Sequence, residues 1–494
     1  MRRKLWVSSV GVIVAIALIG VGDVRAGEAE GVPTFTKDVA PILFNNCVIC
    51  HREGEIAPMS LVSYDETRPW SRAIKDKVVT REMPPWYADR RFGEFRNERG
   101  LTQAEIEVVV AWVDGGAPRG SEADLPAVPI FSSGWQHPTG VDPDVVLNLP
   151  VDLQLPDAGE IPTFGLWQTS PFEEDRFLEA IEMRPGNRAV LHHAGLYSRD
   201  VPAGTEVGAG EAWAGGPHIE TGALVPLHEG VEFDDSVDPE ELEAERQLSI
   251  GAIRDAEADD IFAVDGTDKM VSYVPGRGFE QFWPGVGKRI RADRHLRWSM
   301  HYQSTGKPET DRSQIGLWLQ KVQATHEVLT RRVGQTHVVE SMELVAMPTG
   351  DGRGSRARIP VIPPHADDWA ITGITAFRDD VTLYAMSPHM HLRGKDATYI
   401  VTYPDGREEI ILSVPTYDFN WQLHYELAAP LKIPAGSTIK TVGHFDNSLA
   451  NRYNPAPDRE VYWAEQSWDE MYNGFMEYSI DKLDLTKDTP STEE

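Results

Sequence analysis

The sequence predicts a multidomain fold in which a small all-α domain precedes two all-β domains built as antiparallel sandwiches. The chain has 494 residues, more than one hydrophobic core supports. Apolar residues recur at helical spacing before about residue 125, whereas short alternating runs separated by Pro, Gly, Asn and Asp fill residues 140–478. The runs Ala376 to Tyr384, Ala397 to Tyr403 and Glu408 to Val414 are expected strands.

Residues 1–26 have the pattern of a secretory signal peptide. Basic residues at positions 2–4 precede an apolar run from Leu5 to Val21, and Val24-Arg25-Ala26 supplies a small-residue cleavage site. We therefore expect export to the periplasm of a Gram-negative bacterium, or secretion. The alternative is a retained anchor, because the run approaches the length of a short transmembrane helix. No stable membrane span is expected after cleavage.

The charge of the chain argues against several partners. The formal net charge is −30 at pH 7, so nucleic acid and anionic membrane surfaces are excluded as expected partners. Residues 228–262 form an acidic stretch, which is interpreted as a solvated insertion; a calcium site or a docking surface for a cationic redox partner is the alternative.

The two cysteines of the chain form the motif Cys47-Val48-Ile49-Cys50-His51. This spacing is the attachment signature of c-type haem, in which both thiols form thioethers and His51 becomes an axial iron ligand. A thioredoxin-like redox pair is the alternative, but it needs a βαβ context and no following histidine. The sequence therefore predicts one covalently bound haem c.

Helical patterns surround this motif. A short one contains Val39 and Leu43, a second runs from about Tyr64 to Val79, and a third begins at Thr102 with a capping box and ends at Gly115-Gly116. Three helices around such a motif resemble a class I cytochrome c. A methionine is the expected sixth ligand, and the candidates are Met83, which lies on the loop before the last helix and is favoured, and Met59.

Three histidine clusters and one methionine are the candidate metal ligands of the β region. His192 and His193 are adjacent, so both can bind one ion only if the strand is irregular there. His301 stands alone. His389 and His391 are two residues apart, so they share one face of a strand, and Met471 offers a soft thioether that suits copper.

Taken in this order, these elements resemble the copper type II, ascorbate-dependent monooxygenases, the family of peptidylglycine alpha-hydroxylating and dopamine beta-monooxygenases. The resemblance covers roughly residues 140–480 and implies two jelly-roll-like domains with one copper ion each. It assigns an electron-storing copper to His192, His193 and His301, and the catalytic copper, where O2 reacts, to His389, His391 and Met471. Asn473 also matches the family pattern.

The resemblance completes the expected domain organisation. A signal peptide (1–26) precedes a cytochrome c domain (27–125) and a linker (126–140). Two copper domains follow at 141–330 and 331–482, the first with the acidic insertion, and an acidic tail (483–494) ends the chain.

The sequence departs from its animal relatives in ways that bear on function. It cannot form their structural disulfides, and Ser387 stands where the peptide-hydroxylating enzyme has an arginine that clamps a substrate carboxylate. We expect an enzyme that hydroxylates a C–H bond of a small organic substrate with O2. Its electrons would come from an ascorbate-like reductant or a redox protein through the haem. The alternatives are a non-catalytic electron-transfer or copper-binding protein and a binding module with structural histidines.

Overall fold

The computed structural model describes residues 31–55, 57–130, 134–159, 161, 164–199, 212–215, 225–226, 268–332, 336–340, 343–346, 362–461 and 467–487. Strands make up 38% of it and helices 12%, and most of the sheets are antiparallel. The expected signal peptide, the acidic stretch 228–262 and the last residues of the acidic tail lie outside these ranges. Within them, no helix is both long and apolar enough to cross a membrane.

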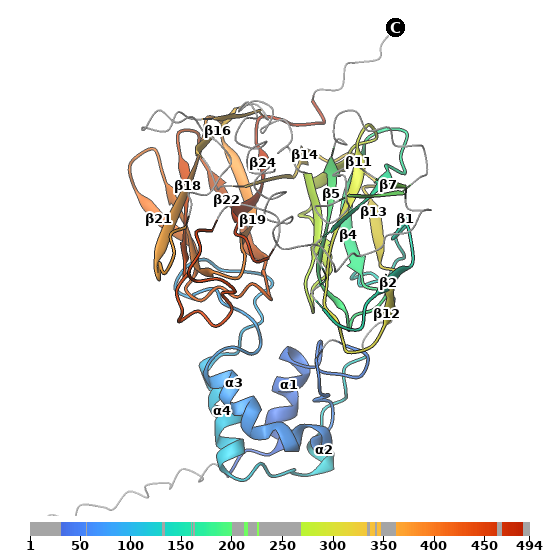
Figure 1. Ribbon diagram of the computed structural model, residues 1–494, viewed down its shortest axis with the longest axis vertical. Helices are drawn as coiled ribbons and strands as arrows, with labels where there is room; N and C mark the ends of the chain where they lie inside the picture. The colour runs from blue at the N-terminus through green and yellow to red at the C-terminus, as the bar shows by residue number, and fades with distance from the viewer. Residues whose placement is uncertain are drawn as a thin grey trace, which may run out of the picture.

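The N-terminal part is a small group of helices below the two β regions (Figure 1). It comprises a π-helical turn (Phe35–Val39), α1 (Ala40–Asn46), α2 (Tyr64–Thr67), a 3-10 turn (Arg68–Trp70), α3 (Ser71–Val79), α4 (Gln103–Asp114) and a 3-10 turn (Glu122–Asp124). The expected helices are confirmed, and α4 has the predicted capping box between Thr102 and Glu105. The second stretch is divided at the 3-10 turn, which contains Pro69, because proline cannot donate a backbone hydrogen bond.

The first β region consists of two six-stranded sheets packed on one hydrophobic core and a two-stranded ribbon. One large sheet has the order β1-β13-β4-β10-β14, with β9 on β4, and the other β7-β6-β3-β11-β5-β8. The strands are β1 (Val145–Asn148), β2 (Leu153–Leu155), β3 (Phe164–Thr169), β4 (Arg176–Arg184), β5 (Leu191–Arg199), β6 (Ala212–Gly215), β7 (Val225–Pro226), β8 (Asp268–Tyr273), β9 (Phe279–Gln281), β10 (Val286–Ile290), β11 (His295–Tyr302), β12 (Glu309–Asp311), β13 (Gln314–Leu319) and β14 (His326–Glu327).

The second β region pairs a four-stranded sheet, β15-β24-β19-β22, with a six-stranded one, β17-β16-β18-β23-β20-β21. The strands are β15 (Leu329–Arg332), β16 (Thr336–Glu340), β17 (Glu343–Ala346), β18 (Trp369–Phe377), β19 (Val381–Met390), β20 (Gly394–Thr402), β21 (Glu408–Val414), β22 (Tyr425–Ile433), β23 (Thr438–Phe445) and β24 (Tyr472–Ile480). The predicted strand at 376–384 is wrong in extent, because the polar sequence Arg378-Asp379-Asp380 turns the chain between β18 and β19.

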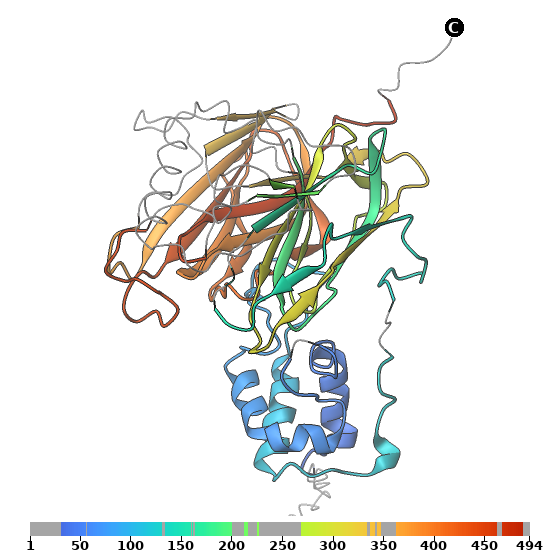
Figure 2. The same ribbon diagram turned by 45° about the vertical axis from the view of Figure 1, so that its right-hand side comes forward.

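The helical part is not packed separately from the second β region. Trp86 and Phe95, which lie between α3 and α4, belong to the core of that region, and both rings contact Tyr425 of β22, at centroid distances of 5.0 and 5.5 Å. After α4 the chain runs up along the outside of the molecule to β1 (Figure 2). The segment that follows Met83 therefore anchors the helices to the second β region.

Candidate metal centre and adjoining cavity

A β-bulge brings the first three histidines together. In the pairing of β5 with β11, His193 lies opposite His301 and Leu191 lies opposite Tyr302, which leaves His192 as the extra residue. A bulge of this kind turns one side chain away from regular alternation. The irregular backbone expected from two adjacent histidines is thus confirmed.

The three imidazoles have the spacing of a metal site. One nitrogen atom from each of the three rings lies within 4.8 Å of the corresponding nitrogens of the other two. The ring centroids of His193 and His301 are 4.5 Å apart, and His192 is 5.0 and 5.2 Å from them. Burial is the main cause that holds the pKa of His193 well below its ordinary value and lowers the pKa of His301 to about 4. Charge repulsion from neighbouring histidines is the second cause for both residues. Neutral imidazoles are the form that binds metals.

The second set of candidate ligands lies on β19 and just before β24. His389 pairs with Asn473 and Met390 with Tyr472 at the end of this pairing, and His391 and Met471 are the next residues of the two segments. Directly opposed residues share one face of a sheet. The centroids of the His389 and His391 rings are 5.2 Å apart, and the Asn473 amide donates to Met471 Sδ at 3.6 Å.

The same ring nitrogen of each histidine in this second set is hydrogen-bonded to a carbonyl oxygen. His389 Nδ1 lies 2.6 Å from Gln422 Oε1, and His391 Nδ1 lies 3.3 Å from the backbone oxygen of Asp469. Such partners fix the tautomer of a metal-binding histidine and orient its ring. Any metal bond is thereby assigned to Nε2 of both rings.

A buried carboxyl group, that of Glu470, holds the backbone of this second set. Glu470 accepts hydrogen bonds from the backbone N–H groups of His391 (2.8 Å), Arg393 (2.6 Å) and Met471 (3.3 Å). Burial raises the pKa of Glu470 to about 8, against the opposing effect of these donors. The Arg393 side chain, also buried, donates to the backbone oxygen of Trp468 and to Asn447. These hydrogen bonds join residues 391–393 to residues 468–471, two segments that are distant in the sequence.

The two sets of ligands approach each other across the space between the β regions. The Phe419 ring lies 5.5 Å from His193 and 5.9 Å from His391, measured between centroids. His389 and His391 are also close enough to His193 to oppose its protonation. The structure therefore places His389 and His391 near the cluster of His192, His193 and His301.

A large cavity adjoins this centre, between the helices and the second β region. Its volume is about 730 Å³, within the range of cofactor sites. Cys47, His51, Met59 and Met83 line it from the helical side, and the loop 416–421 with residues of the 446–453 segment lines it from the β side.

The predicted haem residues differ in how they face this cavity. Cys47 and His51 line it, whereas Cys50 lies beside Gly276, at whose position an added Cβ would be 2.8 Å from Cys50 Sγ. His51 Nδ1 lies 3.2 Å from the backbone oxygen of Met59, which leaves Nε2 as the ring nitrogen that could bind a metal. Met59 and Met83 both line the cavity, so Met83 as the sixth ligand stays a prediction.

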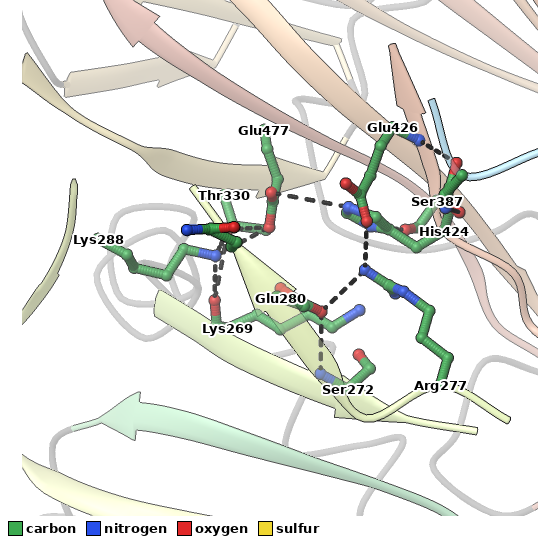
Figure 3. Close-up of polar contacts among 12 residues, drawn as sticks. Lys269, Ser272, Arg277, Glu280, Lys288, Thr330, Ser387, His424, Glu426 and Glu477 are labelled. Carbon is green, nitrogen blue, oxygen red and sulfur yellow. Dashed lines mark hydrogen bonds and ion pairs between the residues drawn. The ribbon is translucent and has the colours of Figure 1, made fainter. Parts of the chain in front are cut away.

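A cluster of buried charged groups connects the two β regions near the centre (Figure 3). Lys288 of β10 donates to Glu477 of β24 at 2.8 Å and to Thr330 of β15 at 2.9 Å. On its other side, Arg277 contacts both Glu280 (3.3 Å) and Glu426 of β22 (3.2 Å).

Ser387 belongs to the edge of this charged cluster. Its hydroxyl lies 2.7 Å from His424 Nδ1, and His424 Nε2 is 3.8 Å from Glu477. Burial and nearby cations hold the pKa of His424 well below its ordinary value. Arg96, from the segment between α3 and α4, also pairs with Glu426 at 2.6 Å. All three parts of the chain meet here.

Sequence reasoning missed the residues that support the ligands. Gln422, Phe419, Asn420 and Glu470 carry no periodic signal, and Glu470 could have been noticed only as the neighbour of Met471. His424 and His444 hydrogen-bond to Ser387 and to Asp396.

Comparison with known proteins assigns no family. A scan against protein-family models and a search of curated proteins found no match. Among solved structures, an uncharacterized protein of Listeria monocytogenes EGD-e is 14% identical over 38% of this chain, with a TM-score of 0.14. This chain covers 14% of that protein's length. The mosquito-larvicidal Cry4Aa toxin of Bacillus thuringiensis is 8% identical over 84% of this chain and 69% of its own, with a TM-score of 0.14. Likenesses this low carry no argument.

Proposed function

We propose that this chain is an exported copper monooxygenase that uses O2 to hydroxylate a C–H bond of a small organic substrate. The observation that carries this proposal is the cluster of His192, His193 and His301, with His389, His391 and Met471 nearby at the end of β19 and the start of β24, beside a cavity lined by Cys47 and His51. The finer fold belongs to the same proposal: a class I cytochrome c domain followed by two jelly-roll-like copper domains.

The residues around the cavity fit a covalently bound haem c in most respects. Cys47 and Cys50 would form the thioethers, His51 would be one axial ligand and Met83 the other, and the haem would supply single electrons. The lining of the cavity is mainly apolar, as in haem pockets, and His51 is already oriented by the carbonyl of Met59. The Cys50 thiol must turn from Gly276 toward the cavity for the second bond to form.

The two sets of metal ligands fit copper by their chemistry. His192, His193 and His301 offer imidazoles alone, whereas His389 and His391 combine with the thioether of Met471, a softer set that suits Cu(I). Copper at these sites would supply one electron from each ion and the place where O2 is reduced.

The protein's own groups prepare this centre. Burial keeps the imidazoles neutral, and Gln422 and the Asp469 carbonyl set the rings of His389 and His391. Phe419 places an apolar ring against histidines of both sets. Hydroxylation consumes one substrate C–H bond, O2, two electrons and two protons, and it yields an alcohol and water.

The substrate is not expected to be a peptide with a C-terminal glycine. Ser387, at the position of the arginine clamp in the resembling peptide-hydroxylating enzyme, is buried and hydrogen-bonded to His424. A hydroxyl engaged in this way supplies no cation for a substrate carboxylate. We propose a small neutral or weakly polar organic substrate, with an ascorbate-like reductant or a redox protein as electron donor.

Metal analysis of the purified, copper-reconstituted protein tests this proposal. We expect one haem iron and two copper ions per chain, with one copper lost or loosened in Met471→Ala and in His389→Ala. Met390→Leu is the matched control. Met390 lies between His389 and His391 in the sequence, but its side chain packs in the hydrophobic core of the second β region. Haem iron without stoichiometric copper would overturn the proposal.

Oxygen uptake separates the enzyme from a non-catalytic electron carrier. We expect the reduced, metal-loaded protein to consume O2 faster when a substrate from a panel of small organic compounds is added, and to form its alcohol. Full metal content with no substrate-dependent uptake and no alcohol from any of the panel would favour the electron-transfer alternative.

A further inference from the structure

The cavity between the helices and the second β region has two walls of different character. Apolar side chains of the helical part, those of Leu61, Ile74 and Val78, line it together with His51. The second β region supplies most of the polar lining, which comes from the loop 416–421 and from residues of the segment 446–453. An occupant that suits both walls is therefore apolar on its faces and charged at one edge.

Two of the three cationic side chains that line this cavity are paired with carboxylates. Lys77 of α3 forms an ion pair with Glu82. Lys395 of β20 lies 2.7 Å from a carboxylate oxygen of Asp368, and it also donates to the backbone oxygen of Asp367 at 3.2 Å. The charges of these two lysines are therefore matched by groups of the protein itself.

Arg452 is the third of these cations, and it forms no ion pair with a carboxylate among the residues that the structure describes. Its guanidinium lies over the ring of Tyr453, 4.6 Å from the centroid, and donates to the Tyr453 hydroxyl. Arg452 lines the cavity and is exposed to solvent. A planar guanidinium presents N–H donors that match the two oxygens of a carboxylate. Arg452 is thus the group of the lining that is available to an anion.

The backbone on both sides of Arg452 is held in place by Asn451. The Asn451 side chain donates to the backbone oxygens of Leu392 (3.1 Å) and Asp446 (2.9 Å). Its carbonyl oxygen accepts a hydrogen bond from the backbone N–H of Tyr453 at 3.0 Å. Because Leu392 belongs to the turn that follows β19, these bonds fix the loop to the second β region. The backbone that carries Arg452 is therefore organised before any ligand binds.

The polarity of haem matches the two walls. The porphyrin faces are apolar, and the two propionates lie on the edge opposite the vinyl groups that react with cysteine thiols. Cys50 lies beside Gly276 of the first β region, where an added Cβ would be 2.8 Å from Cys50 Sγ. Glu55, which follows the motif, pairs with Arg188 of the same region at 2.9 Å. The cysteine end of the motif thus faces the first β region, whereas the β-side lining of the cavity comes from the second. This arrangement leaves the propionate edge toward Arg452.

Building on the proposed function, we propose that the second β region completes the haem pocket and that Arg452 binds one haem propionate. The pairing joins a guanidinium to a carboxylate and transfers no electron, proton or atom. Together with the packing of Trp86 and Phe95 on Tyr425, it holds the haem between the helices and the second β region. The cytochrome part then works from one fixed position and not as a tethered carrier that moves.

Two measurements on the haem-loaded full chain test this pairing without reference to hydroxylation. A spectroscopic redox titration gives the reduction potential of the haem, and resonance Raman spectroscopy follows the bending band of its propionates. Arg452→Gln removes the charge, and Arg452→Lys keeps the charge without the guanidinium fork. Arg407→Gln is the matched control. Arg407 is exposed in the same β region and lies over the ring of Tyr403, 3.9 Å from the centroid, but it does not line the cavity.

We expect a lower haem potential in Arg452→Gln, because a propionate without its cation keeps a negative charge that favours ferric over ferrous iron. The propionate band should shift in the same variant. Arg452→Lys should keep most of the parent potential while the band shifts, since an ammonium supplies the charge without two parallel hydrogen bonds. Arg407→Gln changes the net charge of the chain by the same amount, and it should match the parent protein in both measurements.

A parent-like potential and band in Arg452→Gln, or equal shifts in Arg407→Gln, would overturn the inference and leave the monooxygenase proposal standing. If Arg452→Gln does not load haem, Arg452→Lys decides the outcome, since a shifted band supports the pairing and an unchanged band refutes it. A parent protein that carries haem but no copper would refute the proposed function and leave the pairing open to the same two measurements. A parent protein that takes up no haem would overturn the inference together with the proposed haem.

Discussion

Replacing Lys288 by methionine is expected to destabilise the junction between the two β regions by about 3 kcal/mol. The Lys288 ammonium donates to Glu477 (2.8 Å), to Thr330 (2.9 Å) and to the backbone oxygen of Lys269 (2.9 Å). Its side chain is 3% exposed and that of Glu477 11%. Methionine fills a similar volume but leaves the carboxylate of Glu477 without its closest cation.

The magnitude follows from what remains around that carboxylate. Removing one partner of a buried ion pair costs about 3–5 kcal/mol, because the other charge stays buried. Lys269 still acts on Glu477 through its charge, which favours the lower end of the range. Neutralising the carboxylate as well, in Lys288→Met with Glu477→Gln, removes the stranded charge and should recover about 2 kcal/mol relative to the sum of the single changes.

Urea unfolding followed by tryptophan fluorescence measures these values. The transition midpoints of the parent, both single variants and the double variant give the coupling energy, provided that the slope with urea is unchanged. Additivity of the single changes within about 0.5 kcal/mol, or a loss below about 1 kcal/mol in Lys288→Met, would refute the reasoning that this pair joins the two regions.

Three further outcomes are expected. Burial opposes ionisation of Glu477, but Lys288 and its neighbours overcome this effect and lower the pKa of Glu477 from 4.5 to about 2. The contribution of Glu477 to stability is therefore complete above pH 4.5 and is lost as the pH falls from 4.5 toward 2. Acid unfolding of Glu477→Gln should lack this dependence. Met83→Leu should keep the covalent haem but change its spectrum and lower its reduction potential, while Met59→Leu should not, and the reverse result would assign the ligand to Met59. Gln422→Leu should weaken copper binding about 10–100-fold at the His389 site alone, as measured by competition with a chelator; loss at both sites would contradict that assignment.

The parts of the fold that were predictable depend on local signals. The capping box at Thr102 and Glu105 and the glycines after Asp114 define the ends of α4 within a few residues, because the groups that satisfy helix ends are adjacent in sequence. The strand predicted at 376–384 was wrong in extent although a local signal was present. The charged residues Arg378-Asp379-Asp380 interrupt its apolar pattern, and β18 on one side pairs with β23 while β19 on the other pairs with β24.

The grouping of the candidate histidines could be predicted from the sequence, whereas the residues that hydrogen-bond to them could not. His389 and His391 share a face by the geometry of any strand, and the adjacent pair at His192 demanded a bulge, which the pairing with β11 provides. Glu470 and Gln422 have no such pattern. Their roles arise only when β24 and the loop before β22 are brought to β19, and these contacts between distant segments leave no local trace in one sequence.

The charged junction bears on the site because the same strands carry both. Along β19, Ser387 and His389 lie on one face, and along β24 Asn473 and Glu477 lie on the matching face. From the first β region, β8 and β10 bring lysines to this junction, while β5 in the same sheet as β8 carries His193. The pairs that hold the regions together therefore also fix the distance between the two sets of histidines. Lys288→Met loosens the junction and should increase that distance. We therefore expect slower electron transfer between the two sites in a variant whose copper content is still that of the parent protein.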